Sequence, residues 1–250
     1  MRLGLQTASK SSSFVLPKVA EIPVLRYLRD LLLPRPAIPA EPNLVLITRP
    51  EHDVPGEVKI IRRLFAAGLG RLHLRKPSWS ARDHTDFLDA IPDMFWPRIV
   101  FYAYPEIVLS RGLGGFHLKT GESTPRNWPE QRPVSSSSHS YDELMEGPRR
   151  RQYSVLGPVF PSISKKNQVP HRTHREFEVI LQRWRSEGGC PVYALGGVTP
   201  ETAAIAREIG FDGVAFIGCV WESENPVKTF LDLERAWLGE EPARLKKKKS

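Results

Sequence analysis

The sequence predicts a single (β/α)₈ barrel with an N-terminal extension and a short basic C-terminal tail. Between residues 42 and 239, apolar segments of strand length alternate with amphipathic segments of helical spacing, giving eight strand–helix units. Near-continuous apolar strands indicate a parallel sheet covered by helices. Eight units suit a closed barrel better than an open sheet, and no Gly-x-Gly-x-x-Gly turn follows the first strand.

Hydrophobic periodicity defines the first four units. After the first strand, apolar residues recur at helical spacing over 57–67, and Gly68 follows as a stop. The next two helices begin near Ser80 and at Pro105. The segment 120–133 shows little periodicity, so its helix is short or absent. The eight predicted strands are 43–48, 71–76, 98–103, 115–119, 134–139, 153–157, 192–195 and 214–217.

The second half of the barrel rests on weaker signals. The serine-rich segment 134–139 has low strand propensity, but its place in the alternation demands a strand. A helix begins at Tyr141, and a long polar loop over 158–172 precedes the next one. Thr199 is the expected N-cap of the helix after the seventh strand, with Pro200 in its first turn. Phe230, Leu233 and Trp237 form the inward face of the last helix.

The segments outside the barrel are harder to interpret. Residues 1–41 contain a basic, acid-poor start that weakly resembles a transit peptide, and a short helix is expected over 24–33. An extension that packs on the domain and a mis-set start site are equally good interpretations. Residues 240–250 form a basic tail that we expect to be disordered and solvated.

Composition narrows the class of protein. A hydrophobic content of 40% with 26% charged residues is typical of a globular protein, and no apolar run reaches membrane-spanning length. Cys190 and Cys219 lack metal-ligand spacing, which favours free thiols and a cytoplasmic location. The net charge of +8 suits phosphorylated small substrates, whereas no nucleic-acid-binding signature accompanies it. We therefore expect neither a nucleic-acid nor a membrane partner, and a homo-oligomer stays open.

Two glycine turns near the C-terminus predict a phosphate site. Gly196 and Gly197 follow the seventh strand and allow close backbone approach, and the residues after them open a helix. Ile217 and Gly218 follow the eighth strand and supply a second turn. In eight-stranded barrels the loops after strands seven and eight commonly bind phosphate.

Polar residues cluster at the predicted carboxyl ends of the strands, where such barrels carry their chemistry. On the second strand the period of two places His73 and Arg75 on one face, which we expect to be the barrel mouth, with Lys76 beside them. The other candidates at strand ends are Tyr102, His117, Lys119, Glu122, Ser137, His139, Ser162, Ser164 and Lys165.

Six ordered blocks make the chain similar to the thiamine phosphate synthase/TenI family over residues 43 to about 235. The most specific block is Leu-Gly-Pro-Val-Phe-Pro-Ser-Ile-Ser-Lys165. The others are Leu-His-Leu-Arg-Lys-Pro77, Gly-Phe-His-Leu118, Ser-Ser-His-Ser140, Ala-Leu-Gly-Gly-Val198 and Gly-Val-Ala-Phe-Ile217. The resemblance implies an enzyme of thiamine biosynthesis that binds a phosphorylated thiazole.

The resemblance also implies roles for individual residues. Arg75 and Lys165 would hold an anionic part of the substrate, and the Ser162 and Ser164 hydroxyls would donate to the same oxygens. Ser137 would lie in the pyrimidine and pyrophosphate region. His139 matches the proton-transfer histidine of the tautomerase branch, a role that imidazole suits. The backbone amides expected to bind the thiazole phosphate are those of Gly196, Gly197, Ile217 and Gly218.

Departures from the family pattern separate its two reactions. Synthases join a pyrimidine pyrophosphate to a thiazole phosphate, and they usually carry a Mg²⁺-binding Asp where this chain has Ala103. Glu122 is a weak stand-in for the second metal carboxylate. A thiazole tautomerase needs no metal and keeps His139, so the sequence favours it. A synthase with a weakened Mg²⁺ site and a non-catalytic barrel that binds phosphorylated ligands are the alternatives.

Overall fold

The computed structural model describes residues 43–148, 150–161 and 172–240, which all belong to one compact unit. Eight strands, each hydrogen-bonded in parallel to the next, close into a barrel in the order β1 to β8, with β8 returning to β1. The strands are β1 (Leu44–Ile47), β2 (Arg71–Leu74), β3 (Ile99–Phe101), β4 (Gly115–Leu118), β5 (Val134–Ser138), β6 (Tyr153–Leu156), β7 (Val192–Leu195) and β8 (Gly213–Phe216). The predicted (β/α)₈ barrel is confirmed.

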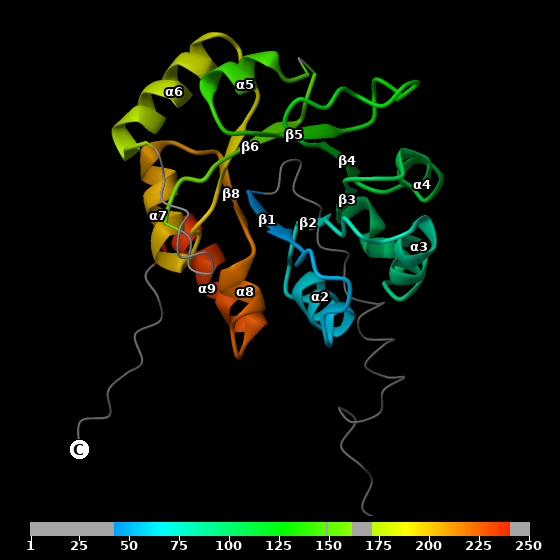
Figure 1. The fold of residues 1–250 in the computed structure, drawn as a ribbon. Helices are drawn as coiled ribbons and strands as arrows, with labels where there is room; N and C mark the ends of the chain where they lie inside the picture. The colour runs from blue at the N-terminus through cyan, green and yellow to red at the C-terminus, as the bar shows by residue number, and fades with distance from the viewer. Residues whose placement is uncertain (1–42, 149, 162–171, 241–250) are drawn as a thin grey trace, which may run out of the picture. The chain divides into compact units, whose positions relative to one another are not determined.

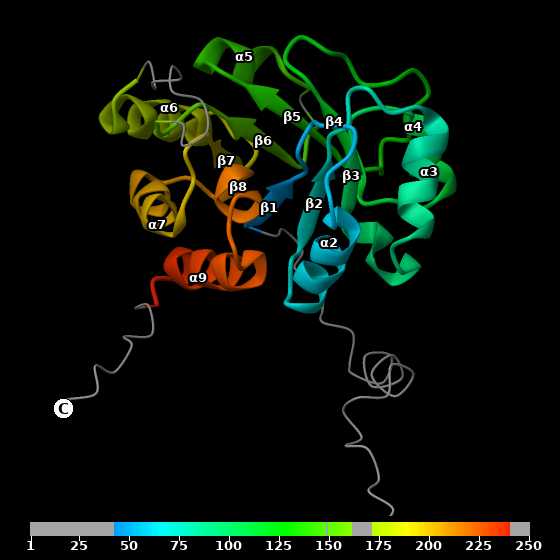
Figure 2. The same cartoon turned by 60° about the horizontal axis from the view of Figure 1, so that its bottom comes forward.

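Helices surround the strands on the outside (Figures 1 and 2). They are α2 (Glu57–Ala66), α3 (Ala81–Asp89), α4 (Pro105–Ser110), α5 (Tyr141–Glu146), α6 (His174–Ser186), α7 (Pro200–Ile209), α8 (Gly218–Trp221) and α9 (Pro226–Leu238). Between β4 and β5 the described chain contains no helix, as the missing periodicity indicated. A 3₁₀ helix over Asp93–Arg98 and the short α8 were not predicted. No helix in the described ranges is long and apolar enough to cross a membrane.

Local sequence explains where several helices begin. Ser80, Thr173 and Thr199 each accept the backbone N–H of the third helical residue, and that residue's side chain bonds back to the cap. Pro200 occupies the first position of α7, and Gly210 ends it with a left-handed φ of 104°. The predicted cap and the proline in the first turn of this helix are confirmed.

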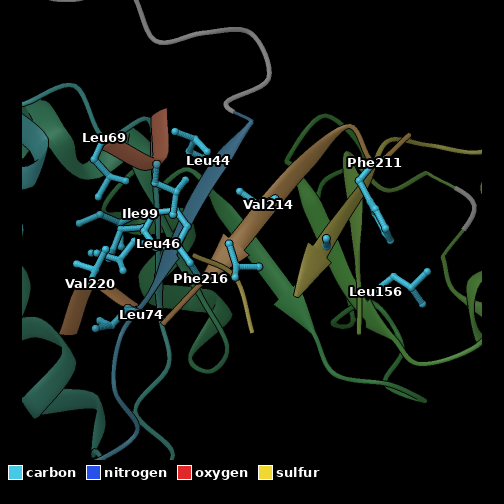
Figure 3. Packing of buried hydrophobic residues seen from close by; sticks show 14 of the residues in the cluster. Leu44, Leu46, Leu69, Leu74, Ile99, Leu156, Phe211, Val214, Phe216 and Val220 are labelled. Carbon is cyan, nitrogen blue, oxygen red and sulfur yellow. The ribbon is translucent and has the colours of Figure 1, made fainter. Parts of the chain in front are cut away.

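Two hydrophobic layers hold the barrel together. The larger layer lies between the strands and the helices and includes Leu46, Ile99 and Phe216, all at most 1% exposed (Figure 3). The smaller layer fills the inside of the barrel, where the Tyr153 and Tyr193 rings stack at 4.7 Å. Alternate strand residues therefore face inward, and near the carboxyl ends of the strands this inner layer becomes polar.

The predictions for the two ends of the chain lie outside this description. The extension over 1–41 with its helix at 24–33, and the tail beyond residue 240, are not among the described residues. The same holds for Ser162, Ser164 and Lys165.

Candidate active site at the barrel mouth

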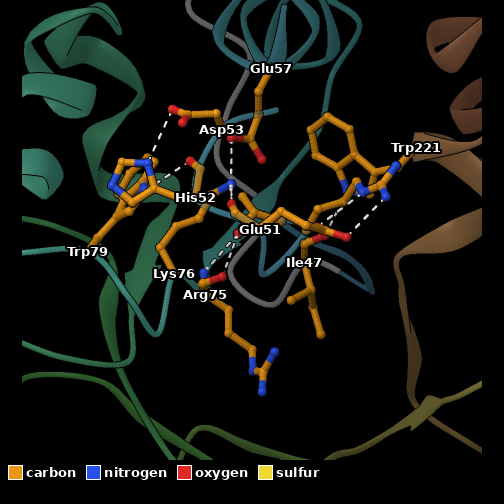
Figure 4. Close-up of polar contacts among 11 residues, drawn as sticks. Ile47, Glu51, His52, Asp53, Glu57, Arg75, Lys76, Trp79 and Trp221 are labelled. Atoms are coloured by element: carbon orange, nitrogen blue, oxygen red, sulfur yellow. Dashed lines mark hydrogen bonds and ion pairs between the residues drawn. The ribbon is translucent and has the colours of Figure 1, made fainter. Parts of the chain in front are cut away.

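Arg75 projects a guanidinium group from the carboxyl end of β2. Its backbone is held on both sides by Thr48, whose hydroxyl accepts the Arg75 N–H at 2.9 Å and donates to the Arg75 carbonyl at 3.3 Å. Within the part of the chain that the structure describes, the guanidinium makes no hydrogen bond or ion pair, and it points away from the neighbouring ion-pair cluster (Figure 4). A fixed backbone with an unpaired cation is suited to holding an anion.

Lys76 points to the opposite side of β2 and is engaged by the protein. Its ammonium lies 2.7 Å from the Glu57 carboxylate and donates to the Glu51 carbonyl at 2.9 Å. It also sits 5.0 Å from the centre of the Trp79 ring. The Lys76 side chain is 0% exposed and that of Glu57 5%, so this pair joins α2 to β2 beneath the surface (Figure 4). This placement gives Lys76 a structural role rather than the substrate contact expected from the sequence.

The Glu57 carboxyl group feels two opposing effects. Burial raises its pKa, because the charged form loses water, and the bond to Lys76 acts in the opposite direction. One of its oxygens, Oε1, has no hydrogen-bond partner among the described residues. The ammonium of Lys76 is therefore the main group that keeps this carboxylate ionised.

Two histidines lie below the mouth, inside the barrel. His73 and His117 are 0% exposed, and their ring centres are 4.8 Å apart. Burial lowers the pKa of His73 well below its ordinary value and that of His117 to about 3, so both rings are neutral at pH 7. The expected inward face of β2 is thus observed, but His73 is sealed from a ligand by the residues around it.

His139 lies at the end of β5 and is exposed. Its Nδ1 is 2.7 Å from the Gly157 carbonyl oxygen. Because a carbonyl only accepts, Nδ1 must carry the hydrogen, which leaves Nε2 of the neutral ring as a free acceptor. The Glu143 carboxylate accepts the His139 backbone N–H and fixes the residue from the other side.

The two glycine turns have the backbone that the sequence predicted. Gly196 and Gly197 adopt left-handed φ angles of 95° and 62°. A Cβ on Gly197 would lie 2.3 Å from the Pro161 carbonyl oxygen, so no other residue fits. At these turns the backbone N–H groups of Gly197, Val198 and Gly218 make no hydrogen bond within the described residues. Backbone N–H groups without a partner after strands seven and eight can donate hydrogen bonds to a phosphate.

Comparison with known proteins agrees with this geometry. Residues 44–220 match the family model described as thiamine monophosphate synthase. The chain belongs to the thiamine monophosphate synthase family. It is 23% identical to a thiamine-phosphate synthase of Laribacter hongkongensis over 200 residues, covering 76% of this chain and 93% of the relative.

Solved structures give the same result. A thiamine phosphate pyrophosphorylase from Bacteroides thetaiotaomicron is 27% identical with a TM-score of 0.65, over 78% of this chain and 96% of that one. A protein of the same name from Pyrococcus furiosus, at 18% identity and a TM-score of 0.63, shares the fold over 79% and 96%.

The residues expected to bind Mg²⁺ in this family do not fit a metal here. Ala103 offers a methyl group, and the Glu122 carboxylate is already engaged by the Lys119 backbone N–H at 2.9 Å and its ammonium at 3.1 Å. Across residues 43–148, 150–161 and 172–240 no three His, Cys, Asp or Glu side chains are grouped to hold a metal ion. The donor set is thus poorer than oxygen-seeking Mg²⁺ requires.

Sequence reasoning missed the residues that support the site. Thr48 and Glu57 carry no family signature, and their partners lie 27 and 19 positions away in the chain. The contact between His139 and the Gly157 carbonyl could not be predicted either, because every residue has a backbone carbonyl and the sequence does not show which one a side chain meets. Only the strand register, known once the barrel closed, brings these groups together.

Proposed function

We propose that this family member is a thiazole phosphate tautomerase of the TenI type. The observation that carries the proposal is the hydrogen bond from His139 Nδ1 to the Gly157 carbonyl, which in the neutral ring leaves Nε2 as the acceptor at an exposed strand end. A base in this state can take a proton from one atom of a bound ring and return it to another. The departures at Ala103 and Glu122 favour a reaction in which no metal neutralises a leaving pyrophosphate.

The other mouth residues would bind the ligand. The free amides of the two glycine turns would hold the thiazole phosphate, and the Arg75 guanidinium would hold a second anionic group such as a carboxylate. Ser137 stands two residues before His139 and would contact the same part of the ligand. Arg75 and the amides would thus position the ring, and His139 would move the proton.

A thiamine phosphate synthase is the second candidate, because the Laribacter relative is named a thiamine-phosphate synthase. The pure protein should be given the non-aromatic thiazole carboxylate phosphate and assayed for the aromatic product. In parallel, aromatic thiazole phosphate, pyrimidine pyrophosphate and Mg²⁺ should be tested for thiamine phosphate. Product only in the second assay overturns the tautomerase proposal, and ligand binding without product in either supports a non-catalytic barrel.

The role of His139 has its own test. His139→Ala should lower tautomerase turnover by about 10²–10⁴-fold, the usual contribution of a general base. His52→Ala is the matched control, since this exposed histidine lies on the β1–α2 loop and should leave turnover unchanged. Full turnover in His139→Ala would show that another group moves the proton.

A further inference from the structure

One hydrogen bond at the seam between β8 and β1 comes from a side chain where the strand register predicts a backbone group. Leu44 pairs with Val214 in this seam, and the Val214 N–H donates to the Asn43 carbonyl at 2.7 Å. In a parallel ladder such a bond recurs every two residues along both strands. Two steps further along, the same relation assigns the Gly218 N–H to the Ile47 carbonyl.

The Ile47 carbonyl accepts a different donor. The indole N–H of Trp221 donates to it at 2.8 Å, although the two residues are 174 positions apart in the chain (Figure 4). The Gly218 N–H makes no hydrogen bond within the described residues. The indole therefore occupies the place in the ladder that the register assigns to the Gly218 amide.

The turn after β8 explains this replacement. The chain leaves the strand at Ile217, whose φ of −133° and ψ of −81° start the single turn of α8. The Trp221 N–H donates to the Ile217 carbonyl at 3.2 Å, which closes that turn. The Trp221 ring is partly buried against the larger hydrophobic layer. A tryptophan N–H in such a place needs a hydrogen-bond partner, and the last carbonyl of β1 supplies it.

The opposite edge of β1 ends in the same way. The Thr48 N–H donates to the His73 carbonyl at 3.0 Å, so the next ladder bond would join the Arg75 N–H to the Thr48 carbonyl. The Thr48 hydroxyl accepts that N–H instead, at 2.9 Å. Side chains thus replace backbone groups on both edges of β1, at the level of the barrel mouth.

We propose that Trp221 is a positioning residue that keeps the Gly218 N–H out of the ladder and available to an anionic oxygen of the ligand. Glycine adds no side chain that could cover this N–H. Without the indole, the carbonyl of Ile47, a residue that is 3% exposed, would lose its partner, and a buried carbonyl without a hydrogen bond is unfavourable. The Gly218 N–H would then bond there, as the register assigns, and be lost to the ligand. The inference rests on the proposed function only for the identity of the bound group as a phosphate.

Amide hydrogen exchange in the unaltered full chain gives the first test, followed by ¹H–¹⁵N spectra at pH 7. Without phosphate, the Gly218 N–H should exchange at least about tenfold faster than the N–H of Phe216, which lies within β8. Inorganic phosphate should slow the exchange at Gly218. Slow exchange without phosphate, or no effect of phosphate at this N–H, overturns the proposal.

Trp221→Phe keeps an aromatic ring and removes the indole N–H. Gly218 should then exchange at least about tenfold more slowly without phosphate, because its N–H bonds to the Ile47 carbonyl. The affinity for inorganic phosphate, measured by calorimetry, should fall about tenfold, as expected for one lost hydrogen bond to a charged group. A change that merely loosened the fold would not slow exchange at Gly218, so this readout separates positioning from a structural role.

Trp96→Phe is the matched control. The Trp96 indole N–H also donates to backbone carbonyls, at 3.2 and 3.1 Å, but it precedes β3 at the opposite end of the barrel. This variant should leave exchange at Gly218 and phosphate affinity unchanged. If Trp221→Phe also leaves either quantity unchanged, the proposal is wrong. None of these measurements uses a thiazole substrate, so a failure of the proposed tautomerase reaction leaves their result standing.

Discussion

Replacing Lys76 by methionine should strongly destabilise the barrel. The Lys76 and Glu57 side chains are 0% and 5% exposed, and their charged atoms are 2.7 Å apart. Removing the ammonium leaves a buried carboxylate that already has one unpartnered oxygen. Breaking a buried pair in this way costs about 3–5 kcal/mol. Since 1 kcal/mol shifts the midpoint of a domain of this size by about 2–4 °C, the melting temperature should fall by roughly 6–20 °C.

The assay is thermal and urea unfolding followed by circular dichroism at pH 7, with two companion variants. Lys76→Met combined with Glu57→Leu removes both charges and should recover most of the loss, because a well-packed apolar pair is often as stable as a buried ion pair. Lys119→Met breaks the exposed Lys119–Glu122 pair, at 60% and 40% exposure, and should cost less than about 1 kcal/mol. A single variant within about 1 kcal/mol of the parent, or a double variant no better than the single, would refute the reasoning.

The pH dependence of that loss has a defined sign. Burial raises the folded-state pKa of Glu57, and without Lys76 the rise is larger. A carboxyl group with a raised folded pKa contributes stability that is fully present below its unfolded pKa of about 4.3 and is lost as pH rises through the raised folded pKa. The deficit of Lys76→Met should therefore be smaller at pH 5 than at pH 7.

Three further outcomes follow from the structure. The folded-state pKa values of His73 and His117 are lowered, so below pH 6.5 the unfolded chain binds more protons than the folded one. The free energy of unfolding, measured with urea, should therefore fall by about 1.4 kcal/mol per pH unit for each ring as the pH is lowered. His117→Gln should remove the part of this pH dependence that comes from one ring. Gly197→Ala should unfold at a lower temperature than Gly68→Ala and lose phosphate affinity in calorimetry, because both positions have positive φ but only Gly197 would place a Cβ against backbone. Glu122→Gln should keep its turnover in the tautomerase assay, since that carboxylate binds Lys119.

Much of the fold could be predicted because strand and helix periods differ and alternate regularly. Even the serine run of β5, a poor strand former, was placed correctly by its position between two clear units. The 3₁₀ helix over Asp93–Arg98 and the four-residue α8 escaped, since an element of about one turn has no period to detect.

The site was only partly predictable because a period of two gives the face of a residue and not its depth. The period of two correctly predicted that His73 and Arg75 face inward, but the two side chains lie at different depths in the barrel. His73 is wholly buried among hydroxyl groups, whereas Arg75, two residues further along the strand, reaches the open end. Lys76, adjacent in sequence, faces outward, and its ammonium is paired with the Glu57 carboxylate. Depth depends on where the partner strands end, and that information is not local.

The pairing of polar groups around the mouth indicates what the ligand must offer. Among the described residues, the Arg75 guanidinium and the backbone N–H groups of Gly197, Val198 and Gly218 are donors without a hydrogen-bond partner at this end of the barrel. The neutral form of His139 adds an acceptor, Nε2, at the end of β5. Because unpaired donors favour anionic oxygens, a matching ligand carries at least two anionic groups. A basic nitrogen beside such donors is suited to take up a proton released from the ligand itself, as the proposed tautomerase reaction requires.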